Sequence, residues 1–267
     1  VLELAPSYFL FENVKGLTIG KHRQFLEEII STFEKNGYSV EGNYRVLNAS
    51  NYGVPQKRER LFLFGCRKNL KIPIYPKKLS EISISDALAD LPEVEKFTEL
   101  LDRDWVETIL GSPSKYAEKL REAEFASCNY GYSRKYNPNL LTSSARTTHT
   151  PLSRKRFAET PHGKTEPVSR FFKLDPQGVC NTLRAGTASD RGAFTSPRPI
   201  HPFTPRCITV REAARIHSYP DWFRFHVTKW HGFRQIGNSV PPLLAQAVAM
   251  EILRALEKKP SKPKKIL

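Results

Sequence analysis

The chain has 267 residues, 39% of them hydrophobic and 26% charged, which is the range of ordinary globular proteins with one or two domains. Lysine and arginine outnumber aspartate and glutamate by 42 to 27, and the net charge of +15 favours a polyanionic partner, nucleic acid first. No apolar run reaches the roughly 18 residues of a membrane span, and the four cysteines lack the spacing of a disulfide framework or a zinc site. We therefore expect a soluble, cytoplasmic protein without a metal.

The first 66 residues show the pattern of an α/β sheet. Residues 7–11 form a short, continuous apolar run, which is typical of a strand buried on both faces of a parallel sheet. Apolar residues at helical spacing predict an amphipathic helix over 21–35, with Gly37 as its stop. Two β-rich runs follow, at 44–49 and 61–66, so the order strand, helix, strand, loop, strand indicates an α/β fold.

The middle of the chain has little periodicity. A short helix is expected around 86–91, and residues 127–207 are rich in Ser, Thr, Pro, Gly and Arg, which predicts a loop-dominated or short-stranded region. The stretch 143–170 carries six cations against two acids and is a candidate phosphate-contacting surface. The six are Arg146, Arg154, Lys155, Arg156, Lys164 and Arg170.

Regular structure returns near the end. Residues 209–212 have the form of a capping box, which predicts a helix that ends before Pro220. Pro241 and Pro242 suit the first turn of a last helix, because proline has no amide donor to lose there. The lysine-rich tail, 258–267, is expected to be disordered.

Two groups of charged residues are candidates for chemistry. Glu12 follows the first apolar run, where a carboxyl group either contacts a nucleic-acid base or simply pairs with an arginine. Arg58 and Arg60 stand at alternate positions entering a strand, so their guanidinium groups point to the same side and can hold a phosphate and a carbonyl. The alternative for this pair is an ordinary salt-bridged strand start.

Four segments, taken in order, resemble the later motifs of the DNA cytosine-C5 methyltransferases. They are Glu12-Asn13-Val14 for motif VI, residues 46–62 with Gly53-Val54-Pro55-Gln56-Lys57-Arg58-Glu59-Arg60 for motifs VII and VIII, residues 209–223 for motif IX, and Gln235-Ile236-Gly237-Asn238-Ser239-Val240-Pro241-Pro242 for motif X. The region between motifs VIII and IX stands where this family carries its target-recognition domain. The resemblance covers nearly all the chain outside that region.

The resemblance implies an α/β fold, with part of a doubly wound, Rossmann-like methyltransferase sheet and a smaller, loop-rich, mostly β recognition domain. The implied domains are 1–80 for the C-terminal half of the catalytic domain and 81–207 for target recognition. Residues 208–257 would hold the motif IX and X helices that return to the catalytic domain, and 258–267 the basic tail.

By the same resemblance the reaction is transfer of a methyl group from S-adenosylmethionine to carbon 5 of a cytosine flipped from duplex DNA. Glu12 would stabilise ring nitrogen N3, and Arg60 first and Arg58 second would hold the cytosine carbonyl and a phosphate. Gln56 and Asn13 would support contact with the DNA.

Motif X implies that Asn238, Ser239 and Val240 lie near the cofactor. For the first two, a helix N-cap before the prolines is an alternative compatible with that role.

In the recognition region, Thr182 belongs to a Thr-Leu element resembling that of the family. Arg184 and Arg191 follow it and are candidates to bond guanine edges, with simple phosphate contact as the alternative. His217 and Cys180 are interpreted as structural.

The sequence departs from the family in two respects. The family's nucleophile lies in a Pro-Cys element and its cofactor on a Gly-rich turn, and neither pattern occurs in these 267 residues. We therefore expect a fragment or one subunit of a split enzyme, inactive alone and dependent on a partner that carries the missing half. A cognate restriction endonuclease is a further expected partner. Two other hypotheses remain: a DNA-binding module without catalysis, and an RNA-directed relative, since a tRNA-acting branch shares these motifs.

Overall fold

The computed structural model describes residues 1–40, 44–121, 137–186 and 198–258. One sheet lies in the first part of the chain, and its strands are β1 (Tyr8–Val14), β2 (Tyr38–Val40), β3 (Arg45–Asn48) and β4 (Glu59–Arg67). The strand order is β1-β4-β2. Strands β2 and β3 share one edge of β4, where β2 pairs with residues 65–67 and β3 with residues 59–62. All three ladders are antiparallel, so β1 and β2 run in the same direction on either side of an opposed β4.

The strand buried on both faces is β4. Its residues 61–66 are all buried, because β4 has neighbours on both edges and helices over both faces. The expectation of a buried strand in a parallel ladder at residues 7–11 is wrong: Phe9 is the buried residue of β1, and Leu10 is 38% exposed. A short apolar run predicts burial but does not say which strand will be central. The strand also continues through Val14, so Glu12 lies within β1 and not at its end.

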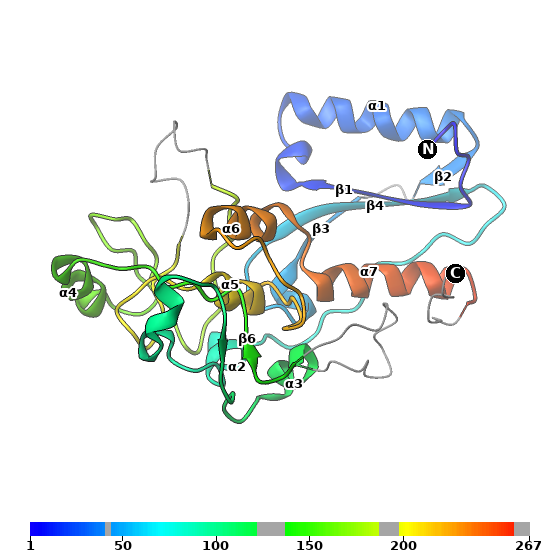
Figure 1. Cartoon of the computed structure of the whole chain (residues 1–267). Helices are drawn as coiled ribbons and strands as arrows, with labels where there is room; N and C mark the ends of the chain where they lie inside the picture. Colours follow the sequence, from blue (N-terminus) through cyan, green and yellow to red (C-terminus); the bar gives the residue numbers. More distant parts are fainter. Residues whose placement is uncertain (41–43, 122–136, 187–197, 259–267) are drawn as a thin grey trace.

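Helices α1 (Lys21–Lys35) and α7 (Pro242–Ala255) cover opposite faces of this sheet (Figure 1). The bounds of α1 are those expected, and its apolar face packs beside Phe9 and Leu63. On the other face Leu244 and Val248 of α7 pack with Phe62. Alternation along β4 therefore sends even-numbered side chains towards α7 and odd-numbered ones towards α1.

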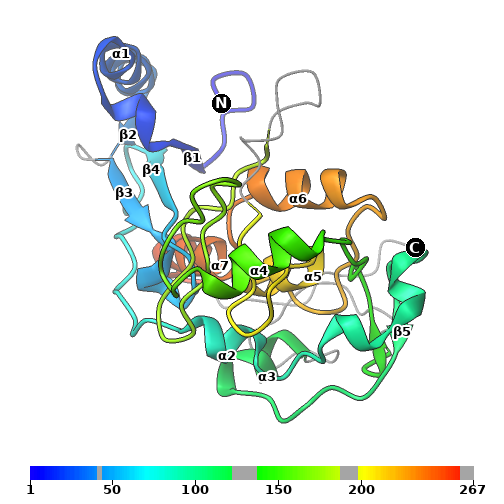
Figure 2. The same cartoon turned by 90° about the vertical axis from the view of Figure 1, so that its left-hand side faces the viewer.

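The rest of the molecule consists of short elements joined by loops (Figure 2). They are α2 (Ile84–Leu88), β5 (Val106–Glu107), α3 (Lys115–Arg121), β6 (Leu140–Leu141), α4 (Pro151–Glu159), α5 (Val210–Ile216) and α6 (Lys229–Asn238), with 3-10 turns at Lys15–Thr18, Ala49–Tyr52, Val94–Lys96 and Thr98–Leu101. Within the described part of residues 81–207, helix and irregular backbone outweigh strand, since the one ladder there, β5–β6, has two residues on each side.

The largest apolar cluster joins residues 81–207, where the resemblance places target recognition and which we call the recognition region, to the later helices. It includes residues of α2, α3, α5 and α6, together with Leu174, Cys180 and Leu183. Thus α5 and α6 pack beneath the recognition region, whereas α7 packs on the sheet. Among the helices described, none has both the length and the apolarity needed to cross a membrane.

Helix α5 begins at the capping box expected from the sequence. The Thr209 hydroxyl accepts from the backbone N–H of Glu212, and the Glu212 carboxylate accepts from the backbone N–H of Thr209 at 2.7 Å. The helix ends at Ile216, before Pro220 as predicted. The tail beyond residue 258 lies outside the described residues.

Candidate functional site

Glu12 and Arg60 lie side by side on neighbouring strands. Arg60 of β4 stands opposite Val14 of β1, two residues from Glu12, and both charged side chains project to the α7 side of the sheet. Arg60 Nε is 3.2 Å from Glu12 Oε1, and Arg60 Nη1 also donates to its neighbour's carbonyl, Glu59 O, at 2.9 Å. The Glu12 side chain keeps 33% of its surface exposed and that of Arg60 13%. The acid and the guanidinium group are therefore held together and remain open to solvent.

Arg58 has a different environment although it is two residues away. It is fully buried, and its guanidinium group donates to the carbonyls of Leu183 (2.9 Å), Gly237 (2.6 Å) and Ser239 (2.8 Å). Burial and the nearby charge of Arg60 lower the pKa of Arg58 to about 10, so it stays cationic at neutral pH. Its bonds go to protein backbone, and the open surface expected for a phosphate contact is not there.

Gln56 is also buried, away from the surface where a DNA contact was expected. Its Oε1 accepts from Leu183 N–H at 3.2 Å, so its amide NH₂ faces His217 Nδ1 at 3.0 Å. Nδ1 must then accept, which leaves the proton on Nε2, and this atom lies 3.1 Å from the Ser239 hydroxyl oxygen. Burial lowers the pKa of His217 well below its usual value, which keeps the ring neutral.

The three residues expected near the cofactor are placed differently from one another. Asn238 is exposed and is the last residue of α6, a helix that the sequence pattern did not predict. Ser239 follows as the C-cap, with its hydroxyl near His217 and its carbonyl bonded to Arg58. Val240 is partly buried and packs against the apolar cluster that contains Leu244 and Val248 of α7. The alternative of an N-cap for Asn238 or Ser239 is wrong, because the residue before α7 is Pro241.

The residues expected to contact DNA from the recognition region are partly described. The Thr182 hydroxyl donates to Lys57 O at 2.6 Å, and Arg184 is exposed. Arg191 lies outside the described residues. Asn13 accepts a bond from Val14 N–H through its Oδ1 at 2.8 Å.

A cavity of about 610 Å³ lies between the start of β4 and the recognition region. Its lining includes Lys57 and Glu59 on one side and Arg170, Phe172, Thr182 and Arg184 on the other. Three of these side chains are cationic, and Glu59 is paired with Lys15 at 2.9 Å. We call this the Lys57 cavity. Sequence reasoning did not single out Lys57, although it stands beside Arg58 in the same basic run.

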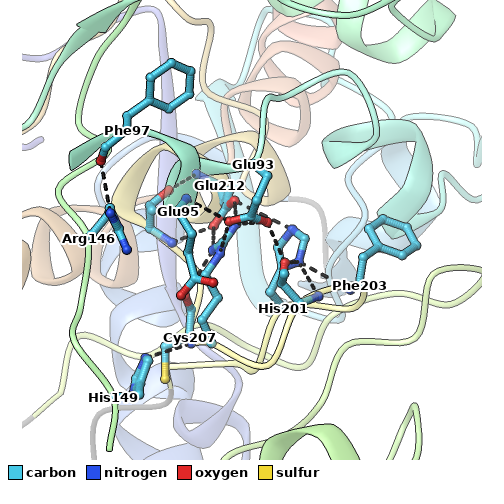
Figure 3. Close-up of polar contacts among 12 residues, drawn as sticks. Glu93, Glu95, Phe97, Arg146, His149, His201, Phe203, Cys207 and Glu212 are labelled. Carbon is cyan, nitrogen blue, oxygen red and sulfur yellow. Dashed lines mark hydrogen bonds and ion pairs between the residues drawn. The ribbon is translucent and has the colours of Figure 1, made fainter. Parts of the chain in front are cut away.

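A buried ion network holds the recognition region to the start of α5 (Figure 3). Arg206 bonds Glu212 at 2.7 Å and 2.9 Å and Glu93 at 2.8 Å. His201 Nε2 is 3.6 Å from Glu212, while its Nδ1 accepts from Thr204 N–H. Burial opposes the charge on Glu212, but Arg206 and His201 hold the pKa of that carboxyl at about 2.

Several of the cations predicted to face phosphate form ion pairs with carboxylates of the same chain. Arg154 bonds Glu95, and Arg156 lies 3.5 Å from Glu166. Of the six expected, Arg170 lines the Lys57 cavity.

The family model for C-5 cytosine-specific DNA methylases matches residues 1–254. The chain belongs to this family. It is 62% identical to type II methyltransferase M.XorII of Xanthomonas oryzae pv. oryzae over 100% of its own length and 63% of that protein. It is 31% identical to type II methyltransferase M.DdeI of Desulfomicrobium norvegicum over 93% of its length and again 63% of that protein. The methylase chain thus spans less than two thirds of the length of these curated relatives.

A solved structure supports the methylase fold. The chain is 32% identical, with a TM-score of 0.77, to a prophage-encoded Escherichia coli protein assigned as a DNA modification methyltransferase. The match covers 96% of this chain and 72% of that one. The likeness to Schizosaccharomyces pombe Dnmt2, at 18% identity and a TM-score of 0.51, shows the shared fold alone.

Proposed function

We propose that this chain supplies the base-binding and recognition parts of a type II DNA (cytosine-5)-methyltransferase, which acts on a cytosine flipped out of duplex DNA with S-adenosylmethionine as the methyl donor. The observation that carries the proposal is the Glu12–Arg60 pair, with its 3.2 Å contact and its remaining exposure. A flipped base loses stacking and pairing worth a few kcal/mol, so polar contacts in its pocket must offset that free energy.

Each member of the pair has a separate part in that pocket. The Arg60 guanidinium group donates to the cytosine carbonyl, while the Glu12 carboxyl group hydrogen-bonds ring nitrogen N3 and limits the charge that collects on the ring. Burial lowers the pKa of Arg60 and the nearby Glu12 opposes that shift, so the cation persists at neutral pH. Arg58 acts indirectly, because it is buried and its guanidinium group donates to backbone carbonyls.

The described residues do not by themselves form a site for S-adenosylmethionine. Of the three candidates, Asn238 is exposed, whereas Ser239 is bonded within the protein and Val240 is partly buried against an apolar cluster. The rest of the cofactor site would then lie on polypeptide outside these 267 residues.

The same holds for the nucleophile. None of the four cysteines follows a proline, and Cys66, Cys180 and Cys207 are buried. Burial raises the pKa of all three, that of Cys207 to about 12, which suppresses the reactive thiolate. A partner carrying a Pro-Cys element and a Gly-rich turn would complete the enzyme, and a restriction endonuclease of the same specificity would be its biological counterpart.

Two alternatives make different predictions. A DNA-binding module without catalysis would bind DNA in a salt-dependent way and gain no activity from such a partner. An RNA-directed enzyme would prefer tRNA over duplex DNA. The long recognition region, 81–207, favours DNA, as do the type II methyltransferase names of the relatives.

The test is a methyl-transfer assay with labelled S-adenosylmethionine on duplex DNA and on tRNA. We expect no transfer by the chain alone and transfer to DNA when the remaining part of a relative such as M.XorII is added. Arg60→Ala should lower the reconstituted rate by at least about 100-fold, as for loss of a charge-stabilising donor. Arg23→Ala, at an exposed ion pair on α1, is the matched loss of an arginine and should leave the rate unchanged.

Activity of the chain without a partner would contradict the dependence on a second part. A full rate for Arg60→Ala in the complete enzyme would contradict the base pocket itself.

A further inference from the structure

We propose that a backbone junction formed by Gln56, Arg58 and Gly237 sets the position of Arg184 and thereby helps determine which bases the protein prefers. The inference rests on the proposed function, because it assumes that Arg184 faces DNA. It adds a positioning role for residues that lie inside the protein and contact no substrate.

The first observation is that residues 180–183 are bonded along the start of β4. Cys180 N–H donates to Pro55 O at 2.9 Å, and Lys57 N–H donates to Cys180 O at 2.8 Å, which makes a parallel bridge between Gln56 and Cys180. The Thr182 hydroxyl continues the contact by donating to Lys57 O. The segment therefore runs beside motif VIII and is joined to it by one isolated parallel bridge.

The second observation is that both backbone groups of Leu183 are held by buried side chains. Gln56 Oε1 accepts from its N–H at 3.2 Å, and Arg58 Nη1 donates to its carbonyl at 2.9 Å. The other guanidinium nitrogen of Arg58, Nη2, bonds the carbonyls of Gly237 and Ser239. Arg58 thus ties the recognition segment to the end of α6 through one rigid, planar group.

The third observation is the absence of a side chain at Gly237. A Cβ atom built there would lie 2.3 Å from Ala185 N and 2.4 Å from the carbonyl carbon of Arg184. Both distances are far inside van der Waals contact and both are to backbone, which cannot rotate away. Glycine at 237 is what allows α6 to lie directly against the peptide that joins Arg184 to Ala185.

Together these contacts fix the main chain immediately around Arg184, while its side chain is exposed and lines the Lys57 cavity. A guanidinium group reads a base edge only when its two donors are aligned, so a small backbone shift is enough to lose that alignment. Phosphate contacts tolerate such a shift better because they depend mainly on charge. Disturbing the junction should change base preference more than overall affinity.

The experiment compares two glycines of the same helix. Gly237→Ala pushes on the backbone of residues 184–185, whereas Gly232→Ala places its Cβ 2.8 Å from the Val210 side chain, inside the apolar core. Both are buried and both add the same methyl group, so they control for helix propensity and for overpacking. The full chain is incubated with a randomised duplex library, and the bound fraction is sequenced at low and at moderate salt. Arg184→Ala is included to identify the base position that Arg184 reads.

We expect wild type and Gly232→Ala to enrich the same sequences. Gly237→Ala should lose about 10-fold or more of the enrichment at the position that Arg184→Ala also loses, with total DNA retention at low salt within about 2-fold. Gln56→Met removes the acceptor for Leu183 N–H without adding bulk and should lower the enrichment at the same base position. This variant tests the proposal if Gly237→Ala does not fold.

Unchanged preference in Gly237→Ala and Gln56→Met, or an equal loss in Gly232→Ala, would overturn the positioning role while leaving the proposed function intact. A wild-type chain that binds the library with no base preference at any position would count against both.

Discussion

At the scale of single residues, two arginines of one motif differ in exposure and in hydrogen-bond partners although they are two positions apart. Arg60 lies beside Glu12 and stays partly exposed, whereas Arg58 is enclosed by carbonyl groups from three distant peptides. A guanidinium group stabilises an enclosed backbone junction well, since it has five donors and remains charged. Alternation along a strand predicted a shared orientation for the two side chains, but no local pattern predicted the burial of one of them.

His217 contacts Gln56 of this junction, and the protonation of its imidazole can be tested. Burial lowers the pKa of the His217 imidazole in the folded protein. Below about pH 6.5 the imidazole therefore binds a proton in the unfolded chain but stays neutral in the folded protein. Its contribution to the free energy of unfolding is therefore complete above that pH and is lost as the pH falls through it. Between pH 6.5 and 5.5 we expect a loss of about 1 kcal/mol from this group.

The measurement is urea unfolding at a series of pH values for wild type and His217→Asn. Asparagine can still accept from Gln56 but does not titrate, so the variant should be less stable at pH 7 and show a flatter pH dependence. His22→Asn, at an exposed site on α1, is the control for a His-to-Asn replacement outside the junction. An unchanged slope in His217→Asn would show that the ring does not resist protonation in the folded state.

At the scale of elements, α5 is a short helix in which every residue is buried, and its start is the part set by local chemistry. The capping box supplies partners for amide groups that would otherwise lack them, and Glu212 serves both the cap and the ion pair with Arg206. This double use explains why seven residues suffice for a stable helix here. The helix then carries Arg211 and Arg215 into bonds with residues of the recognition region, such as Thr142 and Asp90.

Removal of the cap should therefore be measurable. Thr209→Ala is expected to lower the free energy of unfolding by about 1 kcal/mol, since the hydroxyl that accepts from the Glu212 N–H is lost. Thr209→Ser keeps the hydroxyl and should recover most of that loss. Chemical unfolding of both variants tests this, and equal stability of Thr209→Ala and wild type would rule out a stabilising cap.

At the scale of the whole molecule, β1 is an edge strand of the sheet within the described ranges. β1 pairs with β4 on one side, and its Leu10 and Val14 side chains are exposed. An unpaired edge strand with apolar side chains is a template for pairing with another chain. It is also the edge at which the proposed partner would continue the sheet.

We therefore expect the isolated chain to self-associate. Light scattering against concentration should show an apparent mass that rises for wild type and rises less for Leu10→Lys, because a charge on an edge strand opposes pairing. Leu4→Lys is the matched control: Leu4 is more exposed, at 87%, but lies outside the sheet, so its replacement should have little effect. A monodisperse wild-type monomer would contradict the role of this edge.

The sequence by itself determined the features that depend on neighbours along the chain. The 3.6-residue periodicity gave the bounds of α1, the Thr209–Glu212 spacing gave the start of α5, and the two prolines gave the start of α7. The motif residues also indicated the family, and they placed Glu12 and Arg60 together as candidates for one base pocket. These signals are short-range: they are carried by residues within a few positions of one another, or by a pattern of residue types.

Only the tertiary structure decided which strand is central and which motif residues are inside. Gln56 and Arg58 meet partners 125 to 179 residues away, at Leu183, His217 and Gly237, and no local pattern specifies such contacts. Helix α6 was missed for the same reason, since its glycines weaken the helical signal and are there to admit close neighbours. Burial is a property of the packed whole, and it separates the partly exposed Arg60, which we propose faces a substrate, from the buried Arg58, which donates to backbone carbonyls.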